Sequence, residues 1–470
     1  MNILDAFAAR VAEHPDRVAI VDGRGRATTY RALDARAAGL AAAWAARGLR
    51  SGDRVLLAMR VDADLYAALA ALWRIGAAAV FPEPALGLAG LRHAVAATCP
   101  RAFLANGAYR LLPWIVPAVR RIALRLPLDA EGGAYPAADL PDDAPALLSF
   151  TSGSTGAPKA ISRSHGFLRA QNAAVAPLLA SDRAEVDLVA FPVFVVANLG
   201  RGVTSVLPNW HLSRPLSAGA RAIRRHAERA SVTRLLLSPA IAELVADRPP
   251  AGVHTLFVGG GPVFPDLLDR LRARTPGLRI VAVYGSTEAE PIAHLDWDEA
   301  DAADRDAMRG GAGLLAGHVA DAARVRIADE EILVAGDHVV RGYFDPARDA
   351  STKTRDADGT VWHRTGDAGR FDERGRLWLL GRVEGRAGAL RPFPVEAAAR
   401  TWPGVRRAAL ASVGGRPTLA VEGDAAQMPV WRVRFAELGG AEVHRVRRLP
   451  LDRRHGSKVD LRRLTAMLGD

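Results

Sequence analysis

A regular alternation of helical and strand-like segments constrains the fold of this chain more than any other feature. Apolar residues recur at helical spacing in several stretches, and a short apolar run of buried-strand type follows each stretch. The helical stretches are 30–47, 65–75 and 91–97, and the strand-like runs are 54–59, 77–82 and 102–104. After residue 180 the strand-like runs are 187–191, 234–238, 255–258 and 280–284, with a helical stretch at 220–230. Such alternation predicts parallel sheets covered by helices, so we expect an α/β fold.

The texture of the sequence changes twice towards the C-terminus. From about residue 320, short strands alternate with glycine turns, which indicates a β-rich subdomain over 320–380. After Gly381 the chain is richer in arginine and glycine, and we place a hinge there. We therefore expect a large N-terminal domain, 1–383, built of helix-covered sheets plus the β subdomain. A small, mobile α+β domain, 384–470, would follow it.

The charge balance raises the question of an anionic partner. The 470 residues carry a net charge of +11, which suits nucleic acid, nucleotides or coenzyme A. The arginines, however, are interleaved with Asp and Glu, and no block of five or six like charges occurs, so we expect no nucleic-acid partner. No apolar run approaches the roughly 18 residues of a membrane span, and the residues from Met1 to Asp5 lead us to expect no signal peptide. The single cysteine, Cys99, fits a reducing compartment and is expected to be a small buried hydrophobe, so the cytoplasm is the expected location.

Lysine is rare in this chain. Only Lys159, Lys353 and Lys458 occur among the 62 basic residues, and the rest are arginine. A lysine kept against such a bias suggests a site that needs a compact ammonium group. Lys159 ends a run rich in glycine and hydroxyl groups, and Lys458 lies in a Gly-Ser-Lys sequence near the C-terminus, where it fits a catalytic cation. Lys353 has no comparable setting and is expected at the surface.

The run 149–159, Ser-Phe-Thr-Ser-Gly-Ser-Thr-Gly-Ala-Pro-Lys, predicts a phosphate cradle. Its glycines permit backbone conformations in which N–H groups wrap phosphate oxygens. The hydroxyls and the terminal ammonium would add to that cradle. The residues assigned to it are Thr151, Ser152, Gly153, Ser154, Thr155, Gly156 and Lys159. An exposed linker is the alternative, but linkers do not usually follow a strand-like run such as 146–148.

Two further motifs follow strand-like runs. In Tyr284-Gly285-Ser286-Thr287-Glu288, the aromatic ring can stack on a base, Thr287 can bond a phosphate or a carboxylate, and Glu288 can hold Mg²⁺. An ordinary turn would also explain this motif.

The other motif is Arg364-Thr365-Gly366-Asp367, followed by Gly381-Arg382. Asp367 can accept both ribose hydroxyls, and Arg382 can bond the same sugar or a phosphate. A β-turn remains the alternative reading of this segment.

The motifs together resemble the adenylate-forming superfamily, which includes acyl-CoA synthetases, peptide-synthetase adenylation domains and luciferases. The resemblance extends from His14-Pro15-Asp16-Arg17-Val18 to Gly456-Ser457-Lys458-Val459-Asp460. It implies an ATP- and Mg²⁺-dependent ligase that converts a carboxylic acid, such as a fatty acid, to an acyl-AMP with release of pyrophosphate. Transfer to CoA or to the phosphopantetheine of an acyl or peptidyl carrier protein would follow.

The resemblance also assigns roles to residues. Tyr284 should face adenine, and Gly259, Gly260 and Gly261 should line the adenine and acyl pocket. Thr287 and Glu288 should serve phosphate and Mg²⁺, Asp367 should bind the ribose, and Lys458 should contact the carboxylate and the α-phosphate.

Parts of the sequence depart from the usual ligase pattern. Glu384 stands in the hinge where the family usually has Asp or Lys, and the loop 387–396 lacks the usual basic-Gly-aromatic signature beside the thiol tunnel. The segment 191–200 lacks the histidine common in acyl-CoA ligases. The form of this segment, together with the later run 204–208, looks more like the branch that holds the β-lactone synthetases of olefin biosynthesis. A β-lactone synthetase acting on a 3-hydroxy acid, and a non-catalytic acyl or nucleotide sensor, are therefore the alternatives.

Overall fold

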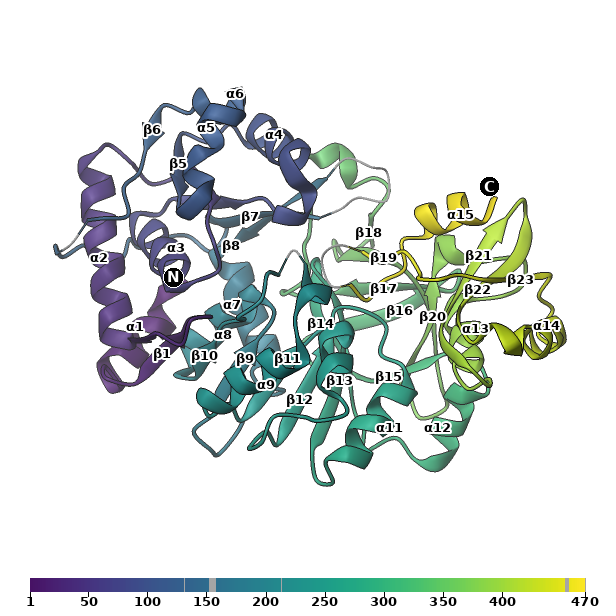
Figure 1. The fold of residues 1–470 in the computed structure, drawn as a ribbon. Coiled ribbons are helices and arrows are strands. Elements are labelled where there is room, and N and C mark those ends of the chain that lie inside the picture. The colour runs from purple at the N-terminus through teal and green to yellow at the C-terminus, as the bar shows by residue number, and fades with distance from the viewer. Residues whose placement is uncertain (131, 152–157, 213, 453–455, 470) are drawn as a thin grey trace.

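The computed structural model describes residues 1–130, 132–151, 158–212, 214–452 and 456–469. Its α/β character confirms the expected fold class. The N-terminal part, in purple and blue in Figure 1, contains a six-stranded sheet in the order β6-β5-β3-β4-β7-β8. Its strands are β3 (Arg54–Ala58), β4 (Ala78–Phe81), β5 (Ala102–Ala105), β6 (Leu124–Arg125), β7 (Pro145–Thr151) and β8 (Lys159–Ser164). All neighbours pair in parallel except β7 and β8, which form an antiparallel hairpin.

The helices of this part are bounded by residues suited to begin and end them. The Asp62 side chain accepts a hydrogen bond from the backbone N–H of Leu65 and so caps α3, and Gly76 ends that helix with φ +84°. The helices are α1 (Leu4–Glu13), α2 (Tyr30–Ala46), α3 (Ala63–Ile75), α4 (Gly87–Thr98), α5 (Leu112–Ile115), α6 (Pro117–Arg120) and α7 (His165–Val175).

Cys99, which follows α4, is exposed and has φ +42°, so the prediction of a buried residue was wrong. Cys99 is the residue that ends α4, in a left-handed conformation, and its side chain does not join the core.

A 14-stranded sheet forms the largest layer, with the order β16-β17-β19-β20-β15-β14-β13-β12-β11-β9-β10-β1-β2 and with β18 paired to β19. The stretch from β1 to β13 through β10, β9, β11 and β12 is parallel, as the alternation predicts. Its strands are β1 (Val18–Val21), β2 (Ala27–Thr29), β9 (Val186–Val189), β10 (Thr204–Val206), β11 (Arg234–Leu237), β12 (Thr255–Gly259) and β13 (Arg279–Ser286). The helices joining or following them are α8 (Pro192–Arg201), α9 (Ala220–Arg229), α10 (Pro239–Val245), α11 (Pro265–Arg274) and α12 (Ala302–Arg309).

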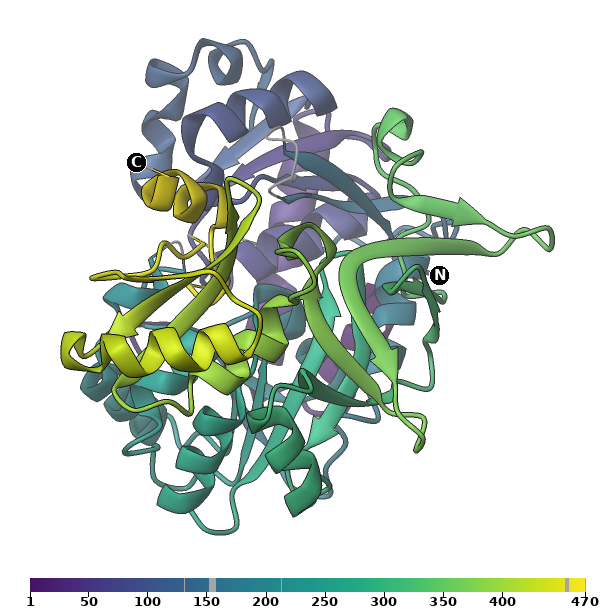
Figure 2. The same ribbon diagram turned by 90° about the vertical axis from the view of Figure 1, so that its right-hand side faces the viewer.

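From β14 onward the sheet is antiparallel, because short turns replace the crossover helices. These strands are β14 (Ala289–Asp296), β15 (Leu314–Val319), β16 (Arg324–Ala328), β17 (Glu331–Ala335), β18 (Lys353–Arg355), β19 (Val361–Phe371) and β20 (Leu377–Arg382). In Figure 2 the long, curved β19 is the green ribbon to the right of the yellow C-terminal segment.

The last segment of the chain has its own apolar core. Trp431, Phe435 and Leu410 are buried in a cluster formed by residues after 386. A three-stranded sheet of β21 (Val405–Val413), β22 (Arg416–Gly423) and β23 (Glu442–Arg445) packs with α13 (Pro392–Ala399), α14 (Met428–Glu437) and α15 (Leu461–Gly469). In Figure 1 this segment, in yellow and yellow-green, lies beside β20, on the side of the molecule away from the N-terminal helices. Among the described residues, no helix is both long and apolar enough to cross a membrane.

Candidate active site

The predicted motifs meet at the carboxyl ends of β12 and β13. Gly259 is the last residue of β12 and pairs with Val283 of β13, immediately before Tyr284. The two neighbouring parallel strands therefore bring the glycine run 259–261 beside the motif 284–288. Ligand sites in open α/β sheets typically lie at this edge.

Tyr284, Asp367 and Arg382 form a connected cluster. The Tyr284 hydroxyl donates to Asp367 Oδ2 at 2.9 Å, and Arg382 Nη1 donates to Asp367 Oδ1 at 3.1 Å. The β19–β20 register places Asp367 directly opposite Arg382. Burial and the nearby carboxylate of Asp367 raise the pKa of Tyr284 well above its usual value, so its hydroxyl stays protonated. Both carboxylate oxygens of Asp367 are thus held in place, and each has a lone pair left for a sugar hydroxyl.

Gly366 makes this cluster possible. Its φ is +71°, and a Cβ at this position would lie 2.7 Å from Arg382 Nη2. A larger residue would be strained in that conformation and would also displace the guanidinium.

Glu288 follows the end of β13 by two residues. Its side chain is held by a residue outside the predicted motifs. Tyr343 Oη donates to Glu288 Oε1 at 2.9 Å. Burial acts to raise the pKa of Glu288, but the Tyr343 hydroxyl and the Lys353 ammonium act against it, and the pKa lies below its usual value. The carboxylate is therefore ionised and pre-oriented.

The side chain of Arg163 links two of the predicted motifs. Arg163 lies on β8 and is 5% exposed. Its Nη1 donates to Ser149 Oγ and its Nη2 to the carbonyl oxygen of Thr287, each at 2.8 Å. The guanidinium therefore couples the start of the cradle run to the Thr287–Glu288 turn. Sequence reasoning missed this residue, whose only signal is an arginine at an inward-facing position of a strand.

The phosphate cradle is described only at its ends. Thr151 and Lys159 are cross-strand partners in the β7–β8 hairpin. Ser152, Gly153, Ser154, Thr155 and Gly156 lie outside the described residues. Lys159 Nζ lies 5.4 Å from the centroid of the Tyr343 ring. The lysine of the cradle is therefore next to the tyrosine whose hydroxyl bonds Glu288.

Lys353 is not at the surface, contrary to the sequence-based expectation. Its Nζ contacts the carbonyl oxygen of Val340 and lies 3.2 Å from His363 Nδ1. The cause is the pairing of β18 with β19, in which Lys353 stands opposite His363 and is covered by the segment before it. Burial lowers the pKa of Lys353 to about 8. The rarity of lysine in the chain was the signal that could have identified this position.

The loop that carries Lys458 contacts the glycine run. Ser457 Oγ accepts a hydrogen bond from the Ala240 backbone N–H at 3.1 Å. A Cβ on Gly261 would lie 2.5 Å from Ser457 Cβ, so the close approach of this loop requires glycine. The backbone N–H of Lys458 donates to Asp452 Oδ1 at 2.8 Å, and the Lys458 side chain is exposed. The structure therefore brings Lys458's loop to the edge where the motifs meet.

The residues present suit a nucleotide with Mg²⁺. Ser286 Oγ is buried and has no hydrogen-bond partner among the described residues, so it can serve a ligand. Over the same part of the chain, no group of three or more His, Cys, Asp or Glu side chains could hold a metal alone. A single carboxylate such as Glu288 is the usual protein contribution to Mg²⁺ when phosphate oxygens and water supply the other ligands.

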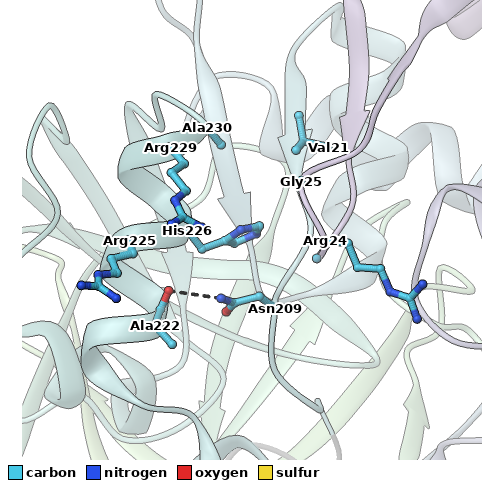
Figure 3. A pocket seen from close by; sticks show the side chains of 10 residues that line it. Val21, Arg24, Gly25, Asn209, Ala222, Arg225, His226, Arg229 and Ala230 are labelled. Atoms are coloured by element: carbon cyan, nitrogen blue, oxygen red, sulfur yellow. Dashed lines mark hydrogen bonds between the residues drawn. The ribbon is translucent and has the colours of Figure 1, made fainter.

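A cavity of about 520 Å³ lies elsewhere, at the β1 end of the large sheet (Figure 3). It is bordered by the β1–β2 turn and α9, and the Asn209 side chain donates to the carbonyl of Ala222 at its rim. None of the predicted site residues borders it, and four strands separate β1 from β13. The candidate site is therefore defined by the converging side chains at β12 and β13.

Comparison with known proteins gives consistent matches. The AMP-binding enzyme family matches residues 7–344. The olefin beta-lactone synthetase of Xanthomonas campestris is 32% identical, over 98% of this chain and 96% of that protein. The protein of the same name from Stenotrophomonas maltophilia is 32% identical, over 90% of this chain and 88% of its own length. Among solved structures, the O-succinylbenzoate coenzyme A synthetase of Bacillus subtilis in complex with ATP and magnesium has a TM-score of 0.80 and 21% identity, with 99% of each chain covered.

Proposed function

Because this chain belongs to the AMP-binding enzyme family, we propose that it uses ATP to activate a carboxylic acid as an acyl-AMP, with release of pyrophosphate. The observation that carries this proposal is the cluster of Tyr284, Asp367 and Arg382 beside Glu288 at one sheet edge. It offers an aromatic face for a base, a carboxylate for a ribose and a second carboxylate for a cation. A nucleotide sensor would need the first two features, but it would not need the catalytic cation expected at Lys458.

In the proposed reaction, an oxygen of the substrate carboxylate attacks the α-phosphorus of ATP, and pyrophosphate leaves. Asp367 accepts the ribose hydroxyls and Tyr284 faces the adenine, while the glycines 259–261 line the pocket. Lys159 and the cradle bind the β- and γ-phosphates, with Thr287 and Arg382 as further phosphate and sugar contacts. Lys458 bonds the carboxylate and the α-phosphate and so offsets the repulsion between two anions. Mg²⁺, held by Glu288, would neutralise charge on the phosphates.

The acyl-AMP then needs an acceptor, and two classes are open to it. The thiol of CoA or of a carrier protein's phosphopantetheine is one. The hydroxyl of a 3-hydroxy acid is the other: its oxygen attacks the acyl carbon, AMP leaves, and a β-lactone forms. The near full-length similarity to proteins named olefin beta-lactone synthetase favours the second class. The atypical loop 387–396 beside the expected thiol tunnel favours it as well.

A single assay separates these possibilities. Pyrophosphate and AMP release would be measured with a panel of acids, in which each 3-hydroxy acid is paired with the same acid lacking the hydroxyl. We expect pyrophosphate release with both members of a pair, and rapid AMP release without any thiol only with the hydroxy acid. AMP release that depends on CoA or a carrier protein would favour a thiol acceptor. No pyrophosphate release with any acid would support a sensor.

A further inference from the structure

Two of the three lysines in the chain converge on one tyrosine. Lys159 Nζ and Lys353 Nζ each lie 5.4 Å from the centroid of the Tyr343 ring. The two lysines are far apart in sequence and come from different sheets, β8 of the six-stranded sheet and β18 of the large sheet. A cation near an aromatic face is attracted by the ring's electron density, so Tyr343 can hold both ammonium groups at close range.

The hydroxyl of the same tyrosine holds the candidate Mg²⁺ carboxylate. Tyr343 Oη donates to Glu288 Oε1 at 2.9 Å, and the backbone N–H of Val340 donates to the Glu288 carbonyl at 2.8 Å. The backbone of Tyr343 is fixed in turn, since its N–H donates to Asp349 Oδ1 at 2.8 Å. Tyr343 therefore contacts Glu288 through its hydroxyl and both lysines through its ring.

Lys353 is fixed more firmly than a surface lysine. Its ammonium bonds the carbonyl of Val340, the residue whose N–H bonds Glu288, and it contacts His363 across the β18–β19 pair. Burial lowers the pKa of His363 to about 4, so this ring is neutral near pH 7. Its Nδ1 can then accept a hydrogen bond from the Lys353 ammonium. A compact ammonium fits such a site, whereas a planar guanidinium would need more space and more acceptors.

We propose that Lys353 is a positioning residue for the polyphosphate end of ATP, and that it acts through Tyr343 and Glu288. This inference rests on the proposed adenylation function. Lys353 anchors the segment 340–343 and adds a second positive charge beside the cradle's Lys159. The ligand class it serves is a magnesium-bound di- or triphosphate. A nucleoside monophosphate, which lacks the β- and γ-phosphates, should not depend on it.

The test compares the binding of ATP with that of AMP by calorimetry, each in saturating Mg²⁺. For Lys353→Met we expect the Kd for ATP to rise by about ten- to a hundredfold, as for the loss of a charged hydrogen bond, while the Kd for AMP changes little. Tyr343→Phe, which keeps the ring but removes the hydroxyl bond to Glu288, should show the same selective loss. Arg341→Met is the matched control, because it removes an exposed positive charge two residues from Tyr343. It should leave both affinities unchanged.

The possible outcomes separate the roles clearly. Equal loss of ATP and AMP affinity in both variants, with a lowered melting temperature, would assign a purely structural role to Lys353. Unchanged ATP affinity in Tyr343→Phe would also overturn the proposal, even if Lys353→Met failed to fold. Wild-type protein that binds neither nucleotide would instead refute the adenylation function itself.

Discussion

Tyr284 and Asp367 are 83 positions apart in the sequence, yet the Tyr284 hydroxyl donates to Asp367 Oδ2 at 2.9 Å. This bond joins the residue expected to face the adenine to the residue expected to bind the ribose. Because Arg382 bonds the other carboxylate oxygen, the carboxylate of Asp367 cannot rotate freely. A nucleoside would therefore meet a carboxylate that is already oriented, and little ordering would be needed on binding.

Replacing Asp367 should weaken ATP binding selectively. We expect Asp367→Ala to cost about 1.5–3 kcal/mol of ATP affinity, the range for hydrogen bonds to a charged group, and to leave the affinity for the acid nearly unchanged. Calorimetry with ATP and with 2′-deoxy- and 3′-deoxy-ATP would measure this cost. If Asp367 binds the ribose, the loss from the substitution and the loss from removing a hydroxyl should not add. Additive losses, or an unchanged Kd for ATP, would contradict the ribose role.

Lys458 should be needed for catalysis and not for stability. Its side chain is exposed, so Lys458→Ala removes little packing, but it also removes the cation expected at the reacting atoms. We expect acid-dependent pyrophosphate release to fall by about 10²–10³, as when one charge-stabilising contact is lost, with an unchanged melting temperature. Arg462→Met, which removes another exposed cation near the C-terminus, is the control and should retain full activity. Wild-type rates in Lys458→Ala would exclude this lysine from the mechanism.

Sequence patterns predicted the fold because its elements are local and strongly apolar. The run 331–335 became β17 (Glu331–Ala335), and the helical stretch 30–47 became α2 (Tyr30–Ala46). Lys353 was misplaced because the segment 351–355 is polar throughout and has no periodicity of its own. Only the pairing of β18 with β19 buries its lysine, and in that pairing Lys353 stands opposite His363, a residue further along the chain.

The candidate site was predictable only where its residues are consecutive. The motif 284–288 and the glycine run 259–261 are short, and each lies at a strand end that the apolar pattern shows. Tyr343 and Arg163 reach the site through contacts across 55 and 124 positions, to Glu288 and Thr287 respectively. No local pattern marks such contacts, so the residues that hold the motif in place were found only in three dimensions.

Glu396 should make the stability of the C-terminal segment depend on pH. It is 6% exposed, accepts the Leu410 N–H at 3.1 Å, and burial raises its pKa to about 7. Between the usual pKa of 4.5 and about 7, the unfolded state loses this proton while the folded state keeps it, so stability falls as pH rises through that window. The shift corresponds to about 3 kcal/mol.

This effect is measurable as a difference between two proteins. Glu396→Gln keeps the hydrogen-bonding shape of the neutral acid but has no proton to lose. Urea unfolding at pH 5 and pH 8 would give the free energy of unfolding of both proteins. We expect similar stability near pH 5 and a more stable variant at pH 8. A constant difference across the two pH values would show that Glu396 does not titrate in this way.

The last segment of the chain should need to move between the two steps of the reaction. In the structure it is docked by Arg400, whose Nε and Nη2 bond the two carboxylate oxygens of Asp266 at 3.0 and 2.9 Å, and by Ser457, which bonds Ala240. This docking places the Lys458 loop at the nucleotide edge, as adenylation requires. A thiol that later attacks the acyl-AMP would need the same space, so we expect a second orientation reached by rotation about residues 382–385.

Val383→Pro tests this rotation. Val383 is the first residue of a short 3₁₀ turn, Val383–Gly385, and the preceding Arg382 is extended with φ −69° and ψ 138°. Proline is tolerated at such a position in the observed orientation, but it fixes φ near roughly −65° and removes part of the hinge's freedom. Ala425→Pro, at the first position of another 3₁₀ turn in the same segment, is the matched control and should leave both steps unchanged. In Val383→Pro we expect pyrophosphate release to survive in a single turnover and thiol-dependent consumption of the acyl-AMP to slow. Equal losses in adenylation and in thiol-dependent consumption of the acyl-AMP would argue against a hinge here. Unchanged AMP release from a 3-hydroxy acid would show that an internal hydroxyl acceptor needs no such rotation.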